Sequence, residues 1–579
     1  MKKAAVILFL AAIMVALPFL FKPKTEKAEW SISDPVLVAI SPHNEAIRQE
    51  FATAFSKWHN EKFGQPVRID WRSIGGTTEI MRFLCSEYIG SMEGWCLRNG
   101  MDFPSTAASA MLDGREVDAS RENAALLSAI RAAYRTNDSP EIASSRIDIL
   151  FGGGSYDHGK AAEQGLTVKP WEADEIPVGI IADENGAELI PKELSGDTWR
   201  TDYFYGAVLS TFGICWNKDR LVDCGIGEPP MTWRDLASPK FFGQVGVADP
   251  TKSGSVSKAY EMIVQQQMAE YIDKLGYTDS DITAFAKKGF SPRWKPSDDK
   301  DAKYLDDVSK AWVHGMNLVR LIGANSKYFT DAAGKIPVDV GMGAIAAGVA
   351  IDFYGRFQAE YTRTVDGNVH MEYATPKGGS CVSADPISLL RGAPHRELAL
   401  RFIEFVLSED GQALWNSRPG TPAGTVKYAL RRLPIRRDFY PSDNKDFQDV
   451  YERHISSSSD DLSSDDINPY RLAENFTYRP EWSARHFGIQ RDLVRAMCLD
   501  SGHELRMAWK AVIDNGGPEA NPEAMELIGR MPTKPIPVTW QSAVTDYRGV
   551  KRLEYMSIWT AEMRANYREA ARLANEKRR

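Results

Sequence analysis

The chain has 579 residues, of which 43% are hydrophobic, 26% are charged and 10% are aromatic. A chain of this length and composition supports large packed cores and about three or four domain-sized units. The formal net charge is -8 at pH 7, so the molecule has no overall positive field. This charge argues against nucleic acid or an anionic membrane surface as the partner, although local anion sites are compatible with it.

The N-terminus has the layout of an export signal. Two lysines precede an apolar run from residue 4 to residue 21, and two more lysines follow it closely. The run has about the minimum length of a membrane-spanning helix, and no clear small-x-small cleavage site follows. We therefore expect residues 1–28 to be a signal peptide or an uncleaved anchor in the inner membrane. Either one places the rest of the chain in the periplasm or outside the cytoplasm.

The cysteine content is typical of an oxidising compartment, in which disulfides form. Two pairs lie close in sequence and could each close a small loop, and the other two could pair across the chain. Six cysteines allow about 15 connectivities, so this pairing is a preference only. Zinc is disfavoured because no C-x-x-C or histidine-rich spacing occurs. The expected pairs are Cys85 with Cys96, Cys215 with Cys224, and Cys381 with Cys498.

Three segments have the order strand, small polar turn, helix. The strands are expected at 35–40, 67–71 and 147–151. This order predicts a parallel α/β sheet, in which ligands bind at the carboxyl ends of the strands. The alternative is that the turn residues only cap the following helices or permit a tight turn. The candidate ligand residues in these turns are Ser41, His43, Gly76, Thr77, Gly153 and Ser155.

A fourth strand–turn–helix unit occupies residues 243–263. A short apolar strand at 245–248 is followed by a turn in which Ser253, Gly254 and Ser255 open a helix. The first turn of a helix leaves backbone N–H groups unpaired and carries the positive end of the helix dipole. These donors predict a site for an anion or a polar ligand. An ordinary N-capped helix with nothing bound is the alternative.

The segments between these units differ in character. Residues 85–146 are too long for a simple connection and predict a helical insertion. Residues 203–216 are aromatic and β-rich, and could form a strand that crosses from one lobe to another. Residues 275–310 are polar and are expected to be an exposed insertion. The serine- and aspartate-rich stretch 456–466 predicts a solvated loop, with calcium binding as the alternative.

Several short motifs follow one another along residues 35–425. They are Ser41-Pro42-His43-Asn44-Glu45, Trp216-Asn217-Lys218-Asp219, Thr232-Trp233-Arg234-Asp235-Leu236, Ala248-Asp249-Pro250, Ser253-Gly254-Ser255, Gly392-Ala393-Pro394-His395 and Phe402-Ile403-Glu404-Phe405-Val406-Leu407-Ser408. In these motifs the chain resembles the extracellular (periplasmic) solute-binding proteins of ABC transporters. It is most similar to the cluster that contains ferric-iron-binding proteins and their phosphorylated-solute and polyamine relatives.

The resemblance implies a type 2 periplasmic-binding fold, an α/β architecture of two lobes that close on a solute like a hinge. Lobe I would comprise 29–207 and lobe II 208–375. Residues 376–430 would return to lobe I, and 431–579 would form a mostly helical extension. The implied function is capture of a small solute for an ABC permease, by a monomer that performs no chemistry. The same fold anchored in the membrane as a ligand sensor is the alternative.

The resemblance also bears on the solute. Ferric-binding relatives have adjacent tyrosines near the position of Asp352-Phe353-Tyr354, together with a histidine after the first strand. Here His43 and Tyr354 could bind a metal, but Phe353 replaces one phenol. Asp352 could instead meet a cation or a ligand hydroxyl. We therefore expect the solute to be ferric iron or a small anionic or phosphorylated compound, with no other cofactor.

Two short stretches of the sequence match the patterns of enzyme motifs. Residues 154–160 match a phosphate-binding loop, but Ala161 stands where Mg²⁺ binding needs Ser or Thr. Ser255 and Lys258 match the S-x-x-K motif of serine acyl-transfer enzymes, and residues 442–444 match S-D-N, but no K-T-G follows. Acyl transfer is retained as a remote alternative.

Overall fold

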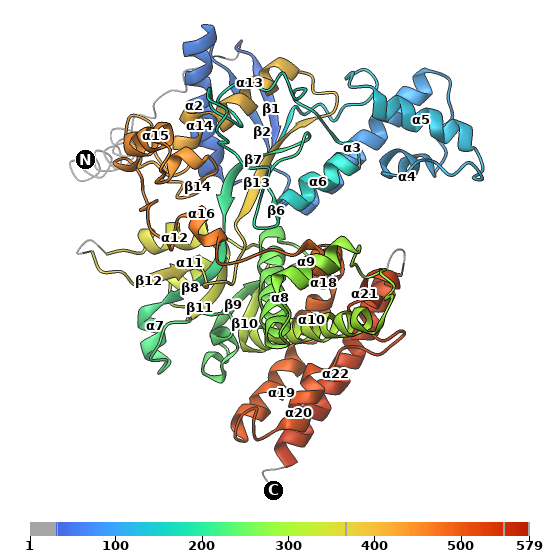
Figure 1. Cartoon of the computed structure of the whole chain (residues 1–579), viewed down its shortest axis with the longest axis vertical. Helices are drawn as coiled ribbons and strands as arrows, with labels where there is room; N and C mark the ends of the chain where they lie inside the picture. Colours follow the sequence, from blue (N-terminus) through green and yellow to red (C-terminus); the bar gives the residue numbers. More distant parts are fainter. Residues whose placement is uncertain (1–30, 32, 365–366, 548–550, 577–579) are drawn as a thin grey trace, which may run out of the picture.

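The computed structural model describes residues 31, 33–364, 367–547 and 551–576. The expected signal peptide or anchor at 1–28 lies outside these residues. The described chain forms two lobes, each built on its own β-sheet, and a helical C-terminal region (Figure 1). The predicted two-lobed α/β class with a helical C-terminal part is thereby confirmed. Among the described helices, none has the length and apolar character needed to span a membrane.

The sheet of lobe I, in the upper half of Figure 1, has seven strands. Their order is β14-β7-β13-β3-β1-β2, and β4 pairs with β13. β1 is parallel to β2 and β3, whereas β13 is antiparallel to β3 and β7. The strands are β1 (Val36–Ile40), β2 (Arg68–Arg72), β3 (Ile149–Phe151), β4 (Thr167–Val168), β7 (Tyr205–Ser210), β13 (Ser383–Leu390) and β14 (Leu433–Pro434). A separate small hairpin pairs β5 (Glu193–Leu194) with β6 (Asp197–Thr198).

Amphipathic helices cover this sheet. Ile47, Phe51, Phe55 and Trp58 recur at helical spacing on α2 (Glu45–Phe63), and all four side chains are buried. The insertion contributes α4 (Ala107–Leu112) and α5 (Ala124–Thr136), which share a second hydrophobic core with α3. The remaining helices of this lobe are α3 (Thr77–Arg98), α6 (Ser155–Glu163), α13 (Arg396–Leu407) and α14 (Glu409–Ala413).

The sheet of lobe II has five strands in the order β10-β9-β11-β8-β12. β9 is parallel to β10 and β11, and β8 is antiparallel to β11 and β12. The strands are β8 (Phe212–Asn217), β9 (Val245–Ala248), β10 (Ser326–Thr330), β11 (Ala347–Ile351) and β12 (Met371–Ala374). The helices are α7 (Lys218–Asp223), α8 (Gly254–Lys274), α9 (Asp279–Lys287), α10 (Asp299–Asn325), α11 (Lys335–Gly341) and α12 (Asp352–Tyr361).

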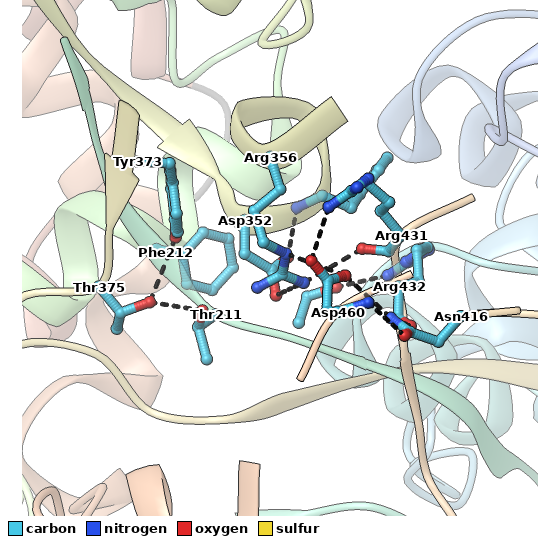
Figure 2. Close-up of polar contacts among 12 residues, drawn as sticks. Thr211, Phe212, Asp352, Arg356, Tyr373, Thr375, Asn416, Arg431, Arg432 and Asp460 are labelled. Atoms are coloured by element: carbon cyan, nitrogen blue, oxygen red, sulfur yellow. Dashed lines mark hydrogen bonds and ion pairs between the residues drawn. The ribbon is translucent and has the colours of Figure 1, made fainter. Parts of the chain in front are cut away.

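Two chain crossings join the lobes. Thr211 separates β7 of the first sheet from β8 of the second, and residues 375–382 lead from β12 back to β13. Figure 2 shows the polar contacts at these crossings. The hydroxyl oxygens of Thr211 and Thr375 are 2.9 Å apart, and Asp352 donates its backbone N–H to the Thr211 carbonyl at 3.0 Å. The two crossing segments are therefore hydrogen-bonded to each other at the boundary between the lobes.

Asp460 completes this network from the segment 456–466. Its carboxylate accepts a hydrogen bond from Asn416 Nδ2 at 3.0 Å and pairs with Arg431 Nη1 at 2.7 Å (Figure 2). Arg356 Nε lies 3.8 Å from the same carboxylate. The sequence predicts a solvated loop here, but the Asp460 side chain is only 5% exposed. Side chains from three distant parts of the chain, Arg356, Asn416 and Arg431, hold it at the boundary between the lobes.

The C-terminal region begins inside lobe I and ends against lobe II. β14 adds to the lobe I sheet, although the sequence places these residues in the extension. Farther on, Trp509 Nε1 donates to Asn325 Oδ1 of α10 at 2.7 Å. The helices are α15 (Lys445–Ile455), α16 (Pro469–Ala473), α17 (Pro480–Ser483), α18 (Phe487–Val494), α19 (Gly502–Asp514), α20 (Pro522–Gly529), α21 (Ser542–Thr545) and α22 (Arg552–Glu576).

Most residues of the segment 275–310 are exposed, as its polarity predicts, but several of its aromatic side chains are buried. Phe285 and Phe290 are nearly fully buried, and the Phe285 ring stacks on Tyr304 with centroids 3.9 Å apart. Phe290 stacks in turn on Trp540 of the C-terminal region at 5.1 Å. The segment is a docking surface for the end of the chain. A few aromatic side chains provide it within an otherwise polar sequence.

The expected disulfides are absent from the structure, in which all six cysteines are free thiols. Cys85 and Cys96 lie on the same helix, α3, eleven residues apart. At a rise of about 1.5 Å per residue, this separation along a helix far exceeds the reach of a disulfide. Burial raises the pKa of the Cys215, Cys381 and Cys498 thiols, which keeps them protonated.

Candidate functional site

A cavity of about 330 Å³ lies between the two lobes. It is formed where the turns after the lobe I strands face the turns of lobe II. Nine of the eleven sequence-predicted ligand residues line it: His43, Gly76, Thr77, Gly153, Ser155, Ser253, Gly254, Ser255 and Tyr354. The lobes approach closely here, because a Cβ built on Gly76 would lie only 3.3 Å from the Lys252 carbonyl oxygen. The cavity is therefore enclosed from both sides.

Several helices begin at this cavity. The N-cap residues of α3 and α6 are Gly76 and Gly154, and neither helix has a side-chain cap. By contrast, Asn44 caps α2 with its side chain and Ser253 caps α8. The first backbone N–H groups of α3 and α6 thus have no side-chain acceptor. Together with the helix dipoles, they give this part of the cavity a positive character without a net charge.

Two glycines permit this convergence. Gly152 and Gly153 have φ angles of +89° and +98°, which L side chains rarely adopt. A Cβ on Gly152 would lie 2.4 Å from His43 Cε1, and one on Gly153 would lie 2.7 Å from Thr77 Cγ2. The turn before α6 can therefore pass directly against the starts of α2 and α3 only because both residues lack a side chain.

His43 is a buried, neutral side chain in the cavity wall. Its ring meets Phe151 edge-on, with centroids 4.7 Å apart, and its Nε2 lies 3.3 Å from Arg432 Nη1. Burial lowers the pKa of His43 well below its ordinary value, and the positive charges of Arg432 and Arg48 lower it further. The neutral imidazole accepts the hydrogen bond from Arg432 through Nε2. Its Nδ1 atom has no partner among the described residues.

Tyr354 stands at the start of α12 with its phenol protonated. Burial raises the pKa of Tyr354, against the opposing effect of Arg432. The neighbouring Phe353 ring packs on Tyr354 with centroids 4.1 Å apart and lies 4.3 Å from the Arg432 guanidinium carbon. The described residues include no group of three or more His, Cys, Asp or Glu side chains that could hold a metal ion.

Ser41 and Asp352 do not line the cavity. The Ser41 hydroxyl accepts a hydrogen bond from the His43 backbone N–H at 3.1 Å and thus shapes the turn. The Asp352 side chain is fully buried and pairs with Arg356 at 3.2 Å (Figure 2). Both residues support the site from behind, Ser41 by positioning His43 and Asp352 by anchoring the start of α12 at the crossing.

Arg432 is the main site residue that the sequence analysis missed. It is fully buried, and its Nη2 donates to Asp385 Oδ2 and to Ser210 Oγ, both at 2.5 Å. Its Nε has no partner among the described residues. It lies in the run Arg431-Arg432-Leu433-Pro434, which the sequence analysis assigned to the extension. An arginine pair directly before a short apolar segment is the only local signal that could have indicated it.

A second charged group lies on the opposite wall. Lys258 of α8 pairs with Glu261 at 3.1 Å, and its ammonium lies 3.8 Å from the centre of the Tyr478 ring. The Tyr478 hydroxyl donates to the same glutamate at 2.7 Å. Burial opposes the charge on Lys258, but Glu261, Tyr478, Cys381 and Asp197 together raise its pKa well above the ordinary value. The lysine is therefore held as a cation.

The C-terminal region closes the outer side of the cavity. Tyr478, Ala484 and Phe487 all line it. The Phe487 ring of α18 packs on Tyr156 of α6 with centroids 4.8 Å apart. Asp157, the next residue on α6, also lines the cavity, and burial raises its pKa to about 6. The nearby charges of Arg491 and Lys160 oppose this rise without cancelling it.

Comparison with known proteins places this geometry in context. A family model described as bacterial extracellular solute-binding protein matches residues 126–428, just over half of the chain. An uncharacterized protein of Haemophilus influenzae is 23% identical over 270 residues, which cover 46% of this chain and 60% of that protein. The chain thus spans less than two thirds of the length of this curated relative.

Solved structures of binding proteins match this chain at low identity and low TM-score. The periplasmic binding protein AfuA of Actinobacillus pleuropneumoniae has a TM-score of 0.41 and 14% identity, covering 74% of this chain and 99% of its own. The spermidine/putrescine-binding protein PotD of Streptococcus pneumoniae has a TM-score of 0.41 and 13% identity, covering 79% and 100%. The apo ferric ion-binding protein A of Pasteurella haemolytica has a TM-score of 0.40 and 13% identity, covering 80% and 97%.

Proposed function

The chain belongs to the family of bacterial extracellular solute-binding proteins, and we propose that it captures a small anionic solute between its two lobes. The solute would carry a carboxylate, phosphate or similar group. The protein would act as a monomer in the periplasm and deliver the solute to the membrane permease of an ABC transporter. Closure would be driven by contacts that the solute makes to both lobes only in the closed form.

The observation that carries this proposal is the pair of uncapped helix starts at the cavity. At the N-termini of α3 and α6, no side chain accepts a hydrogen bond from the first backbone N–H groups. Such donors, aligned with helix dipoles, bind anionic groups well. Ser155 and Thr77 add hydroxyls at the first position of each helix, and both line the cavity. An anionic group placed between them would contact lobe I, while Ser255 could reach it from lobe II.

The side chains support an anion better than ferric iron. Ferric sites favour hard, ionised oxygen ligands, whereas burial raises the pKa of Tyr354 and keeps its phenol protonated. The Arg432 guanidinium lies 3.3 Å from His43 Nε2, so a cation bound to that atom would meet a positive charge. Arg432 would favour an anion at the same place. We therefore assign the anionic class to the solute rather than iron.

The local chemistry also disfavours the acyl-transfer alternative. A lysine that acts as a general base must be able to lose its proton near neutral pH. Here the pKa of Lys258 is raised, because Glu261, Tyr478, Cys381 and Asp197 outweigh the effect of burial. Lys258 instead anchors Glu261 and Tyr478 in the cavity wall.

The test of this proposal is the variant Ser155→Asp. A carboxylate at the start of α6 suits the helix dipole, so the fold should be retained. The same carboxylate would occupy the anion site and repel an anionic solute. A thermal-shift screen of phosphorylated and carboxylated solutes should identify a ligand, since saturation at 100 times the dissociation constant adds about 2.7 kcal/mol of stability. Ser155→Asp should weaken that ligand about tenfold or more, a loss of at least about 1.4 kcal/mol of binding free energy.

The matched control is Ser155→Asn, because asparagine has nearly the size of aspartate but no charge. It should change the affinity much less than Ser155→Asp. Stabilisation by ferric iron or by a polyamine, but by no anion, would contradict the anionic assignment. Equal effects of the Asp and Asn variants would show that the start of α6 does not contact the charged group.

A further inference from the structure

A second cavity, of about 780 Å³, lies next to the first. It is formed by α3 and α6 of lobe I on one side and by α18, α21 and the start of α22 on the other. In Figure 1 the first pair of helices lies above α18 and α21, on the right of the molecule. The two cavities share Tyr156 and Asp157 as lining residues. The C-terminal region and lobe I therefore enclose a space that neither could form alone.

The charge of this second cavity is strongly unbalanced. Five cationic side chains line it against two carboxyl groups, Asp157 and Asp492. Asp492 is paired, since Arg552 Nε donates to its Oδ2 at 2.6 Å. Asp157 forms no salt bridge within the described chain, and burial raises its pKa to about 6. The cations are Arg82, Lys160, Arg485, Arg491 and Arg552.

Four of the five cations have no carboxylate partner within the described ranges. Arg82, Lys160 and Arg485 are exposed and form no salt bridge there. Arg491 donates only to neutral oxygens, from Nε to the Pro250 carbonyl at 2.7 Å and from Nη2 to Thr78 Oγ1 at 3.0 Å. Like charges gathered in a concave site repel one another and concentrate a positive potential, which a bound anion would relieve.

Arg491 is the residue that connects this cavity to both lobes. It stands on α18 of the C-terminal region and reaches Thr78 on lobe I and Pro250 on lobe II. Burial lowers the pKa of Arg491, although Asp157 and Asp492 oppose this effect. The guanidinium is thus held in a partly desolvated place by hydrogen bonds to neutral groups. A planar guanidinium in this setting is well suited to pair with a phosphate or carboxylate.

We propose that this basic cavity is a second anion-binding site, and that it takes a polyvalent anion such as an organic phosphate. The anion would bind between Lys160 of lobe I and Arg485 and Arg491 of the C-terminal region. Its source could be the distal end of the captured solute, since the cavities adjoin, or a separate anion from solution. The site does not depend on the anionic assignment of the first cavity, because the two cavities have no cationic side chain in common.

Titration calorimetry of the protein with pyrophosphate as the probe tests this site. The double variant Lys160→Gln/Arg485→Gln removes two exposed charges that line only the second cavity. The control Lys57→Gln/Arg121→Gln removes two exposed charges from elsewhere on lobe I and changes the net charge equally. We expect the first variant to weaken pyrophosphate about tenfold or more, and the control to stay within about twofold of the wild type.

The variant Ser155→Asp separates the two sources. If it leaves pyrophosphate affinity unchanged, the second cavity binds an independent anion. If Ser155→Asp and Lys160→Gln/Arg485→Gln each weaken pyrophosphate binding, one anion spans both cavities. The proposal is overturned if the wild type does not bind pyrophosphate, or if Lys160→Gln/Arg485→Gln binds it as tightly as the control does. Loss with Ser155→Asp alone would also overturn it, while supporting the first site.

Discussion

We expect pH to change anion binding through Asp157, which lines both cavities. Its pKa is raised to about 6 because burial disfavours the carboxylate. The folded protein therefore binds this proton more tightly than the unfolded chain, and the stability from this group falls as pH rises from about 4 to about 6. Above that range the carboxylate is charged and repels an anion nearby. His43 does not titrate there, since burial lowers its pKa well below its ordinary value.

We expect the affinity for sulfate, whose charge is constant in this range, to rise about tenfold as pH falls from 7 to 5. Asp157→Asn should show the tighter binding at both pH values, since the amide cannot ionise. Calorimetric titrations at several pH values measure this slope. If Asp157→Asn keeps the slope of the wild type, another group is responsible.

Arg432 and Asp385 form a buried ion pair whose two halves depend on each other. The Arg432 side chain is fully buried, and Asp385 is 18% exposed. Replacing one partner leaves the other charge in a poorly solvated place, so Arg432→Met should cost about 3–5 kcal/mol of unfolding free energy. The double variant Arg432→Met/Asp385→Asn should recover a large part of that loss. Urea denaturation measures both values.

An exposed ion pair provides the control. Lys62 and Glu404 are 3.2 Å apart with side chains 51% and 31% exposed. Lys62→Met should change the unfolding free energy by less than about 1 kcal/mol, because water screens such pairs. A loss at Arg432 as small as the loss at Lys62 would mean that solvent reaches the pair and that the cavity is more open than described.

The C-terminal region is joined to lobe II by specific buried hydrogen bonds. Trp509 of α19 donates its indole N–H to Asn325 Oδ1, and the Asn325 amide donates to the carbonyls of Leu236 and Ser238. Trp509→Phe keeps an aromatic side chain but leaves the buried amide oxygen of Asn325 without its donor. The expected cost is about 1–3 kcal/mol of unfolding free energy. Thermal or chemical denaturation measures it.

Trp95→Phe, on the half-buried face of α3, is the matched control. Its indole N–H donates no hydrogen bond to the described part of the protein, so the substitution should cost clearly less. If the two variants are equally stable, the bond between Trp509 and Asn325 is not what holds α19 against lobe II.

The elements that carry the first cavity could be predicted from sequence because their signals are local. Apolar strands at 36–40, 149–151 and 245–248 are each followed by small polar residues. The turns therefore could be placed, and most of the candidate residues in them line the cavity. The close packing that requires glycine at positions 152 and 153 could not be predicted from the sequence, because it depends on His43 and Thr77 from other turns.

The contacts that complete the site join residues far apart in the sequence. No local sequence pattern predicts such contacts. Arg432 reaches Ser210 and Asp385, which lie far from it in the sequence. Polar residues at 275–310 and 456–466 suggested solvent exposure, but a few of their side chains are buried by partners from distant segments. Ser41 and Asp352 were plausible by type, yet their side chains bond to the protein behind the cavity.

The two lobes are in contact in this structure. A Cβ on Gly254 would lie 3.9 Å from Asp157 Oδ2, so the two walls nearly meet. If the protein closes like a hinge at the Thr211 crossing, the solute-free form should be more extended. We expect small-angle scattering to show a decrease in the radius of gyration when the solute binds. An unchanged radius on saturation would contradict hinge closure.

A crystal structure with the solute that gives the largest thermal shift tests the proposed anion site most directly. We expect its anionic group to lie within hydrogen-bond distance of the backbone N–H groups at the starts of α3 and α6, beside Thr77 and Ser155. The solute should also contact lobe II, near Ser255. A cationic or metal solute at this place, or an anionic group bound away from both helix starts, would rule out the proposed anion site.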